Sequence, residues 1–245
     1  GEENIVWAFQ VGMTGSVTFG LAHLLLADRD GGLGRMDLLA LAFGLASVMS
    51  TGIGPLMVAA TGVAMLLRRG WKVAAFHTVP LGVLYGIWYA IEKPRTNTAF
   101  GNPSVEVLVA WIREGVIGAY LGIAQYPAAA VAIGVLTVSG VLLAWSRLPW
   151  ARFRREAALP LGLLLAVPLL FASTAWGRWI FGEQFARSSR YVHVATVFLL
   201  PVIAVAASAY VRRWRYSAIP IVALLIVGIP GNAFQEGSGA ASLNR

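Results

Sequence analysis

The chain contains no cysteine and carries little charge. The absence of cysteine from all 245 residues excludes disulfide bonds, thiol nucleophiles and thiolate metal sites. Only 12% of the residues are charged, whereas a soluble domain carries roughly 25%. A phosphate-binding loop, a glycine-rich dinucleotide motif and an HExxH motif are missing, and the three histidines (His23, His77 and His193) are scattered. The sequence therefore supports no cofactor and no metal site.

Long apolar runs are what the chain has in abundance. Hydrophobic residues make up 58% of it and its mean hydropathy is +0.72. A helix needs about 20 apolar residues to cross a bilayer core about 30 Å thick, and runs that are continuous rather than alternating favour helices over a barrel. We therefore predict an all-α, polytopic integral membrane protein, a single transmembrane domain over residues 1–245, with about seven or eight transmembrane helices. The predicted spans are residues 4–27, 73–91, 125–146, 157–176, 191–210 and 217–234, together with the stretch 38–67.

The stretch 38–67 permits two interpretations. As a single helix its 30 residues would reach about 45 Å, which is too long for a bilayer without strong tilt. The motif STGIGP at residues 50–55 interrupts it with glycine and proline. We predict two short helices, 37–49 and 53–67, that meet at this motif on the outer side. The alternative is one tilted helix, which would reverse the first span relative to everything that follows.

The cations indicate the orientation of the chain. The net charge of +8 would suggest nucleic acid as the partner of a soluble protein. Here, however, 12 of the 19 cations fall in short connections on one side of the predicted topology, which the positive-inside rule makes cytoplasmic. We expect a multi-pass protein of the plasma membrane with no nucleic-acid partner. The 12 cations are Arg29, Arg35, Arg68, Arg69, Lys72, Arg147, Arg152, Arg154, Arg155, Arg212, Arg213 and Arg215.

Residues 104–119 have the pattern of a helix that lies on the outer membrane surface. Val105, Leu108 and Val109 begin an apolar face at helical spacing, and Arg113 and Glu114 fall on the opposite, polar face. We therefore predict an interfacial helix at residues 104–119 on the outer face of the membrane.

The extracytoplasmic loop at residues 177–190 is the candidate functional segment. Arg178, Arg187 and Arg190 alternate there with aromatic side chains, between two apolar runs. Arginine holds phosphate by bidentate, charge-assisted hydrogen bonds, so such a loop suits an anionic lipid headgroup. The alternative is an aromatic belt in which arginines anchor the helix ends. The outward-facing charged set comprises Glu2, Glu3, Glu92, Lys93, Arg95, Arg113, Glu114, Arg178, Glu183, Arg187 and Arg190.

Ionisable residues within the predicted spans are scarce. A proton-coupled carrier would be expected to have an intramembrane carboxylate, so this scarcity counts against a transporter. His23 is a lone polar residue in an apolar span, and we assign it no role.

Three segments resemble the GT-C superfamily of membrane glycosyltransferases. Arg190-Tyr191 precedes an apolar helix that contains Pro201, as in the late helix of many members. The opening EENIVWAFQVG resembles a Glu/Asp, Trp, Phe-Gln segment of bacterial members, and the helix pair around STGIGP resembles their paired short helices. The resemblance implies a polyprenyl-phosphate sugar donor, a glycan or lipid acceptor, and transfer at the outer membrane face.

The resemblance also implies roles for individual residues. Arg187 and Arg190 would stabilise the leaving lipid phosphate. A second group, Arg178, Tyr191, Trp7 and Gln10, would contact the donor. The family's catalytic Asp or Glu lies in the first outer loop of the full protein. Because the chain starts at Gly1 and shows no signal peptide, we expect a C-terminal fragment. Glu2 and Glu3 are then only secondary acidic candidates.

Other functions remain open at this point. A carrier or flippase for a lipid-linked glycan could use the same cationic loop without chemistry. A noncatalytic membrane subunit would need the helices but not the arginines. Members of the superfamily differ in whether they need a divalent metal, and the sequence shows no ligand cluster for one.

Overall fold

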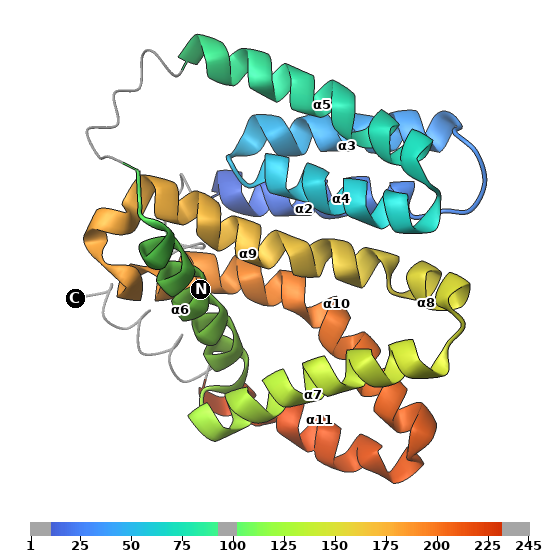
Figure 1. Cartoon of the computed structure of the whole chain (residues 1–245), viewed down its shortest axis with the longest axis vertical. Helices are drawn as coiled ribbons and strands as arrows, with labels where there is room; N and C mark the ends of the chain where they lie inside the picture. Colours follow the sequence, from blue (N-terminus) through green and yellow to red (C-terminus); the bar gives the residue numbers. More distant parts are fainter. Residues whose placement is uncertain (1–10, 93–101, 232–245) are drawn as a thin grey trace.

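The computed structural model describes residues 11–92 and 102–231, and within these ranges the chain forms helices and turns with no strand (Figure 1). The prediction of an all-α protein is therefore confirmed. Five helices are long and apolar enough to cross a membrane: α5 (Trp71–Glu92), α6 (Val105–Ala124), α7 (Pro127–Arg147), α9 (Ala158–Arg178, continued by η2 to Phe181) and α10 (Ser189–Arg213). We therefore describe the chain as a helical membrane protein.

The first part of the bundle consists of α2 (Val11–Ala27), α3 (Arg35–Ser50), α4 (Gly54–Arg68) and α5. α3 and α4 are separate helices, so the two-helix interpretation of residues 38–67 is confirmed. Pro55 lies in the first turn of α4, where its missing N–H costs nothing. A Cβ atom on Gly54 would collide with the backbone of Ser47 and Val48. The close approach at this bend therefore requires glycine.

The second part consists of α6, α7, α8 (Trp150–Glu156), α9, α10 and α11 (Ala218–Ile226). The connection between α7 and α9 contains the short helix α8. α9 lies between α4 and α10 and buries one side against each of them, with Leu163 and Phe171 fully enclosed. Gly162 packs on the backbone of Ala60 in α4, because a glycine lets two membrane helices approach closely. α9 thus joins the two parts.

The helix connections gather at two ends of the molecule. The α2–α3 connection, the α4–α5 turn and α8 lie at one end, which we call the inner end (Figure 1). The α3–α4 bend and the short 3₁₀ helices η2 (Trp179–Phe181) and η3 (Glu183–Arg187) lie at the opposite, outer end. All 12 cations predicted to be cytoplasmic fall at the inner end. The fold therefore separates them from the segment 177–190.

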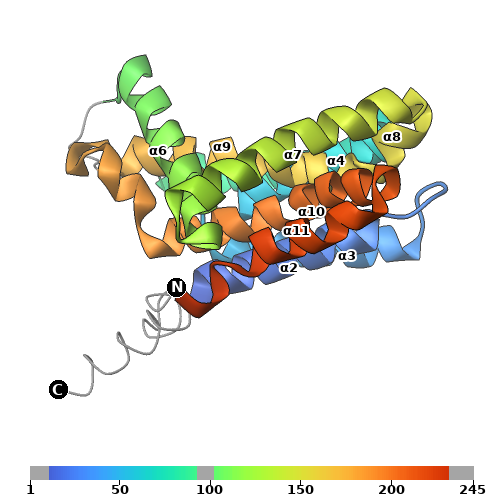
Figure 2. The same ribbon diagram turned by 90° about the horizontal axis from the view of Figure 1, so that it is seen from below.

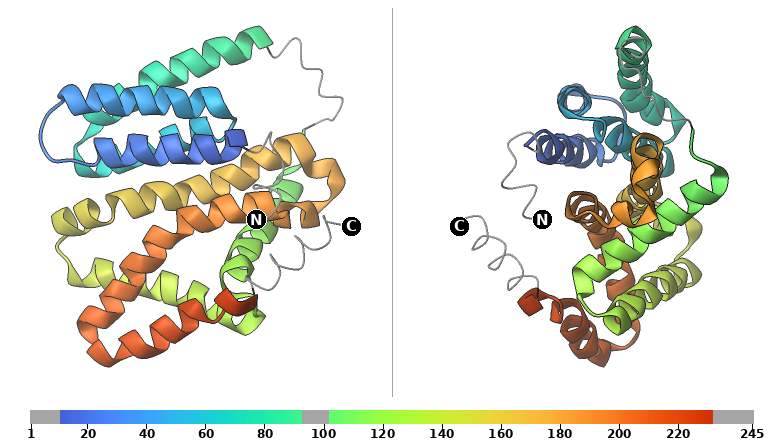
Figure 3. Two further views of the ribbon diagram at one scale, coloured as in Figure 1. Left: turned by 180° about the vertical axis from the view of Figure 1, so that it is seen from behind. Right: turned by 90° about the vertical axis from the view of Figure 1, so that its left-hand side faces the viewer.

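α6 runs in a different direction from its neighbours. It crosses the outer end of the bundle transversely to α9 and α10 (Figures 1 and 2). In the end-on view of Figure 3 it runs diagonally while α2 and α3 are seen along their axes. Its length and hydropathy would also suit a membrane span. The interfacial position predicted for residues 104–119 stays a prediction.

Candidate anion site at the outer end

The segment between α9 and α10 is a folded structure rather than an open loop. η2 and η3 follow one another across Gly182, whose φ of +83° lies in the region that favours glycine. η3 packs against α6, and Ala186 within it is fully buried. The arginines of this segment are therefore held on short, fixed elements.

Tyr191 forms the centre of the site. Its side chain is buried at the start of α10, and two guanidinium groups lie on its ring. Cζ of Arg178 is 5.6 Å from the ring centroid and Cζ of Arg190 is 5.2 Å from it. Arg190 also lies 5.5 Å from the ring of Phe185. Each such cation–π contact contributes about 0.5–2 kcal/mol and holds the cation in place without cancelling its charge.

Arg178 and Arg190 keep hydrogen-bonding capacity for a ligand. Within residues 11–92 and 102–231, neither guanidinium forms an ion pair with a carboxylate. Nε of Arg190 is buried and has no hydrogen-bond acceptor among these residues. An anion with several oxygens, such as a phosphate, could accept hydrogen bonds from these two guanidinium groups.

Arg187 has a different environment from the other two arginines. Its Nη2 lies 2.5 Å from Oε2 of Glu114, and Nη2 of Arg113 lies 3.2 Å from Oε1 of the same carboxylate. Arg113 also reaches Glu183 at 3.9 Å. The charge of Arg187 is therefore compensated within the protein.

The charges of the outer cluster do not balance one another among the described residues. We define this cluster by six charged residues: Arg113, Glu114, Arg178, Glu183, Arg187 and Arg190. Four of them are arginines and two are glutamates, which leaves a net charge of +2. The surplus positive charge lies on the arginines that contact Tyr191. An anionic ligand would therefore meet its strongest attraction there.

α6 presents Glu114 to this cluster because of how it packs. Trp111 is fully buried and its Nε1 donates a hydrogen bond to Oγ1 of Thr174 in α9, at 3.1 Å. This contact turns the same face of α6, with Glu114 and Gly115, toward the protein, and leaves Val105 and Val109 exposed. Glu114, which the sequence pattern assigns to the polar face of the helix, is therefore buried. The helix packs through Trp111 and its small residues, and Val105 and Val109 of the expected apolar face do not contribute.

The structure brings some of the predicted site residues together. Arg178 and Arg190 both contact the ring of Tyr191. Arg187 lies in η3 and pairs with Glu114 of α6. The remaining predicted contacts and acidic candidates, Glu2, Glu3, Trp7 and Gln10, lie outside the described residues, as do Lys93 and Arg95. Among the described residues no group of three or more His, Cys, Asp or Glu side chains is arranged to hold a metal ion.

A second charged cluster, at the inner end, was missed by the sequence analysis. Asp37 is completely buried and forms ion pairs with Arg29 at 2.9 Å and with Arg69 at 2.5 Å. Its carboxylate also accepts hydrogen bonds from the N–H of Gly34, at 2.8 Å, and from Nε2 of His77, at 3.1 Å. Asp37 is therefore a buried, paired charge that the sequence analysis did not identify. The sequence does contain a signal for this cluster: Asp37 lies in the first turn of a predicted helix, next to a connection that contains arginines, and could have been expected to pair with them.

The histidines extend this inner cluster into the bundle. Nε2 of His23 lies 3.0 Å from Nδ1 of His77, and both rings are completely buried. Because two arginines keep Asp37 ionised, Nε2 of His77 must be the donor to it. Nδ1 of His77 then accepts from Nε2–H of His23, a tautomer assignment inferred from the hydrogen bonds. His23, which we had assigned no role, thus closes a polar chain that links α2, α5 and α3.

Arg68 adds a more exposed pair beside this cluster. It lies 2.9 Å from Asp28 and 3.5 Å from Asp30 in the α2–α3 connection. Burial raises the pKa of the Asp28 carboxyl, while the guanidinium of Arg68 acts in the opposite direction. The inner cluster and this neighbouring pair together contain three arginines (Arg29, Arg68 and Arg69) and three aspartates (Asp28, Asp30 and Asp37), so their charges balance, unlike those of the outer cluster.

Comparisons with known protein families, with curated proteins and with solved structures found no match to this chain.

Proposed function

We propose that the chain is the membrane domain, or a large part of it, of a GT-C type glycosyltransferase of the plasma membrane. It would transfer a sugar from a polyprenyl-phosphate donor to a cell-envelope glycan or lipid at the outer face. One observation carries the proposal: Arg178 and Arg190 lie on the ring of Tyr191 with no carboxylate partner among the described residues. A lipid phosphate has the charge and the oxygens that this pair lacks.

The chemistry of the transfer explains why such a pair would matter. When the acceptor hydroxyl attacks the sugar, negative charge develops on the departing lipid phosphate. Guanidinium groups that are already in place stabilise that charge without having to reorganise. Arg178 and Arg190 would do this, and Tyr191 would hold both in position. Glu2 and Glu3 remain the proposed acidic contributors, and Trp7 and Gln10 the proposed donor contacts.

Arg187 would lie near the donor and would also have a positioning role. Its ion pair with Glu114 ties η3 to α6, so we propose that Arg187 positions the segment that carries the other two arginines. A direct contact with the phosphate would use only the donors of Arg187 that Glu114 leaves free.

The membrane topology is part of the same proposal. Besides the five long helices, the shorter apolar helices α2, α4 and the segment Arg215–Gly231 would cross or enter the bilayer. With α6 on the outer surface and α3 paired with α4, the chain would have about seven or eight spanning helices. This arrangement would place Tyr191 at the outer boundary of the bilayer, where the phosphate of a polyprenyl lipid lies.

The first test is binding of a polyprenyl phosphate to the purified chain in detergent. Each lost charge-assisted hydrogen bond is worth about 1.5–3 kcal/mol, so Arg178→Gln and Arg190→Gln should each weaken binding by roughly tenfold or more. Arg155→Gln, an exposed arginine of the inner end, is the matched control and should bind as the original does. Equal affinity in the original chain and the three variants would show that Arg178 and Arg190 do not bind the lipid phosphate.

The second test measures sugar transfer by the full-length protein. Arg190→Gln should abolish transfer from a labelled polyprenyl-phosphate sugar while the protein remains folded. Transfer near the original rate would remove the catalytic contribution of Arg190.

One observation favours a second candidate, a carrier or flippase for a lipid-linked glycan. Asp37, His77 and His23 form a buried chain of ionisable residues within the helical bundle, and carriers often use such residues within the membrane. Movement of the lipid across vesicles with no change in its chemical structure would support this candidate over the transferase.

A further inference from the structure

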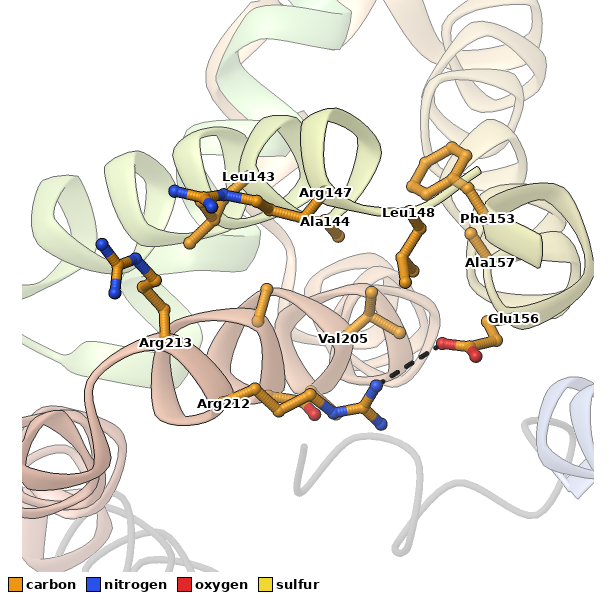
Figure 4. Close-up of a pocket in the computed structure, with 13 residues that line it drawn as sticks. Leu143, Ala144, Arg147, Leu148, Phe153, Glu156, Ala157, Val205, Arg212 and Arg213 are labelled. Carbon is orange, nitrogen blue, oxygen red and sulfur yellow. Dashed lines mark ion pairs between the residues drawn. The ribbon is translucent and has the colours of Figure 1, made fainter. Parts of the chain in front are cut away.

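A cavity of about 610 Å³ lies at the inner end, between α7, α8 and α10, away from the outer cluster (Figure 4). Its walls are apolar and include Leu143, Leu148, Phe153 and Val205. The polar residues Arg147, Glu156, Arg212 and Arg213 also line it. Figure 4 shows the arginines on α7 and α10 and the glutamate on α8, around the apolar side chains.

The shape of α10 explains why the cavity forms here. Near the middle of the two helices, Gly140 of α7 packs on Ala206 of α10 so closely that a Cβ atom would not fit. α10 contains Pro201 and changes direction along its length, away from α9 (Figure 1). The inner ends of α7 and α10 and the short helix α8 then enclose a space that no side chain fills.

The charges that line the cavity are unbalanced. Glu156 lies 3.7 Å from Arg212 and 2.7 Å from Arg152, so its single negative charge is shared by two arginines. Within the described parts of the chain, Arg147 and Arg213 have no ion pair, and Arg213 stacks on the ring of Trp214 at 5.1 Å. The lining of the cavity therefore carries a surplus of positive charge beside an apolar wall.

We propose that this cavity binds one anionic phospholipid of the inner leaflet. Arg147 and Arg213 would hold the phosphate of the headgroup, and an acyl chain would lie on Leu143, Leu148 and Val205. A basic pocket between membrane helices on the cytoplasmic side is the usual setting for an anionic headgroup. A zwitterionic lipid offers the arginines no net charge, and a soluble phosphate ester leaves the apolar wall uncovered. An anionic lipid matches both parts of the lining.

The test counts lipids bound to the purified chain by native mass spectrometry and measures their affinity. We expect one phosphatidylglycerol per chain, held at least tenfold more tightly than phosphatidylcholine and than glycerol 3-phosphate. The double variant Arg147→Gln with Arg213→Gln should lose this preference. Equal binding of phosphatidylglycerol and phosphatidylcholine by the original chain would overturn the proposal, and so would equal binding of glycerol 3-phosphate.

Two further variants separate a built site from general attraction to a basic surface. Arg35→Gln with Arg155→Gln removes the same charge from the inner end outside the cavity and should change the affinity less than twofold. Val205→Phe narrows the cavity without changing charge and should weaken binding of phosphatidylglycerol by at least fivefold. A charge-matched control that loses as much affinity as the Arg147 and Arg213 pair would show that no specific site exists.

The inner and outer sites are tested independently of each other. Arg190→Gln at the outer end should leave phosphatidylglycerol binding unchanged. The double variant at Arg147 and Arg213 should keep its affinity for polyprenyl phosphate. The result for phospholipid binding at the inner cavity is therefore independent of the result for polyprenyl-phosphate binding at the outer site.

Discussion

The inner cluster around Asp37 and the outer cluster around Tyr191 use the same residue type in opposite ways. At the inner end, Arg29 and Arg69 converge on one buried carboxylate, which also accepts two further hydrogen bonds. At the outer end, Arg178 and Arg190 converge on an aromatic ring that carries no charge. An arginine whose counter-charge is built into the fold stabilises the fold. An arginine held by a neutral ring stays available for a ligand.

Burial explains why the two clusters differ. The side chain of Arg69 is 2% exposed, and a charge at that depth is very costly without a partner. The side chain of Arg187, which is paired at the outer end, is 38% exposed, and Arg178 is an exposed residue. Water and lipid headgroups can solvate cations at such a boundary, so the fold tolerates uncompensated charge there.

The largest expected effect comes from removing the buried counter-charge. Asp37→Asn keeps the shape of the side chain but leaves Arg69 unpaired inside the protein, so it should lower the free energy of unfolding by about 3–5 kcal/mol. Asp30→Asn is the matched control, because Asp30 is 77% exposed, and it should change stability by less than about 0.5 kcal/mol. Unfolding in mixed micelles measures both. Similar stabilities for the two variants would contradict the structural role of the inner cluster.

A smaller loss should follow from crowding the same cluster without touching a charge. A Cβ atom on Gly44 would lie 2.7 Å from Nδ1 of His23 and 2.6 Å from Cδ1 of Leu81. Gly44→Ala should therefore destabilise the protein by about 1–3 kcal/mol. Gly82→Ala introduces the same methyl group on α5, where no heavy atom lies within 4 Å, and it should be nearly neutral. Thermal unfolding in detergent compares the pair, and a neutral Gly44→Ala would mean that α2 and α3 can move apart freely.

A mixed effect is expected at Glu114, the carboxylate of the outer cluster that pairs with Arg187. Glu114→Gln removes the partner of Arg187 and Arg113, so stability should fall by about 1–2 kcal/mol, reduced by the exposure of both arginines. The same change leaves Arg187, like Arg190, without a carboxylate partner among the described residues. The affinity for a polyprenyl phosphate should therefore rise by severalfold. Measuring polyprenyl-phosphate binding and unfolding of the same variant tests both the expected gain in affinity and the expected loss of stability. Weaker binding in this variant would indicate that the Arg187–Glu114 pair is needed to shape the site.

The smallest effect on stability is expected for Arg190→Lys. Lysine keeps the charge but lacks the planar fork that stacks on Tyr191 and grips a phosphate through two donors. The free energy of unfolding should change by less than about 0.5 kcal/mol, while the affinity for polyprenyl phosphate should fall by roughly tenfold. Unchanged affinity would mean that charge alone, without stacking, explains the outer site.

Local signals in the sequence were sufficient for several parts of the fold. The length of the apolar runs predicted the long helices, and the glycines and proline of STGIGP predicted the break between α3 and α4. Each of these signals lies within one continuous segment of the chain, so no knowledge of distant contacts is needed to interpret it. The direction in which α6 packs could not be found this way. It depends on a hydrogen bond from Trp111 to Thr174, 63 residues further along the chain.

The candidate site was predictable only in its composition. The sequence identified Arg178, Arg187 and Arg190 as a group, because they alternate with aromatic residues beside an apolar run. It could not show that Arg187 is paired with Glu114, since the two lie on separate elements that meet only in the folded chain. The same holds for His23 and His77, which are 54 residues apart and share a hydrogen bond.

The sequence by itself determined that this is a helical membrane protein with its cations gathered mainly on one side, because hydropathy and charge are properties of each segment alone. The tertiary structure decided which cations are paired with a carboxylate and which, among the described residues, have no such partner. That distinction depends on distances of a few ångströms between side chains of different helices, and Coulomb attraction and desolvation both change steeply over such distances.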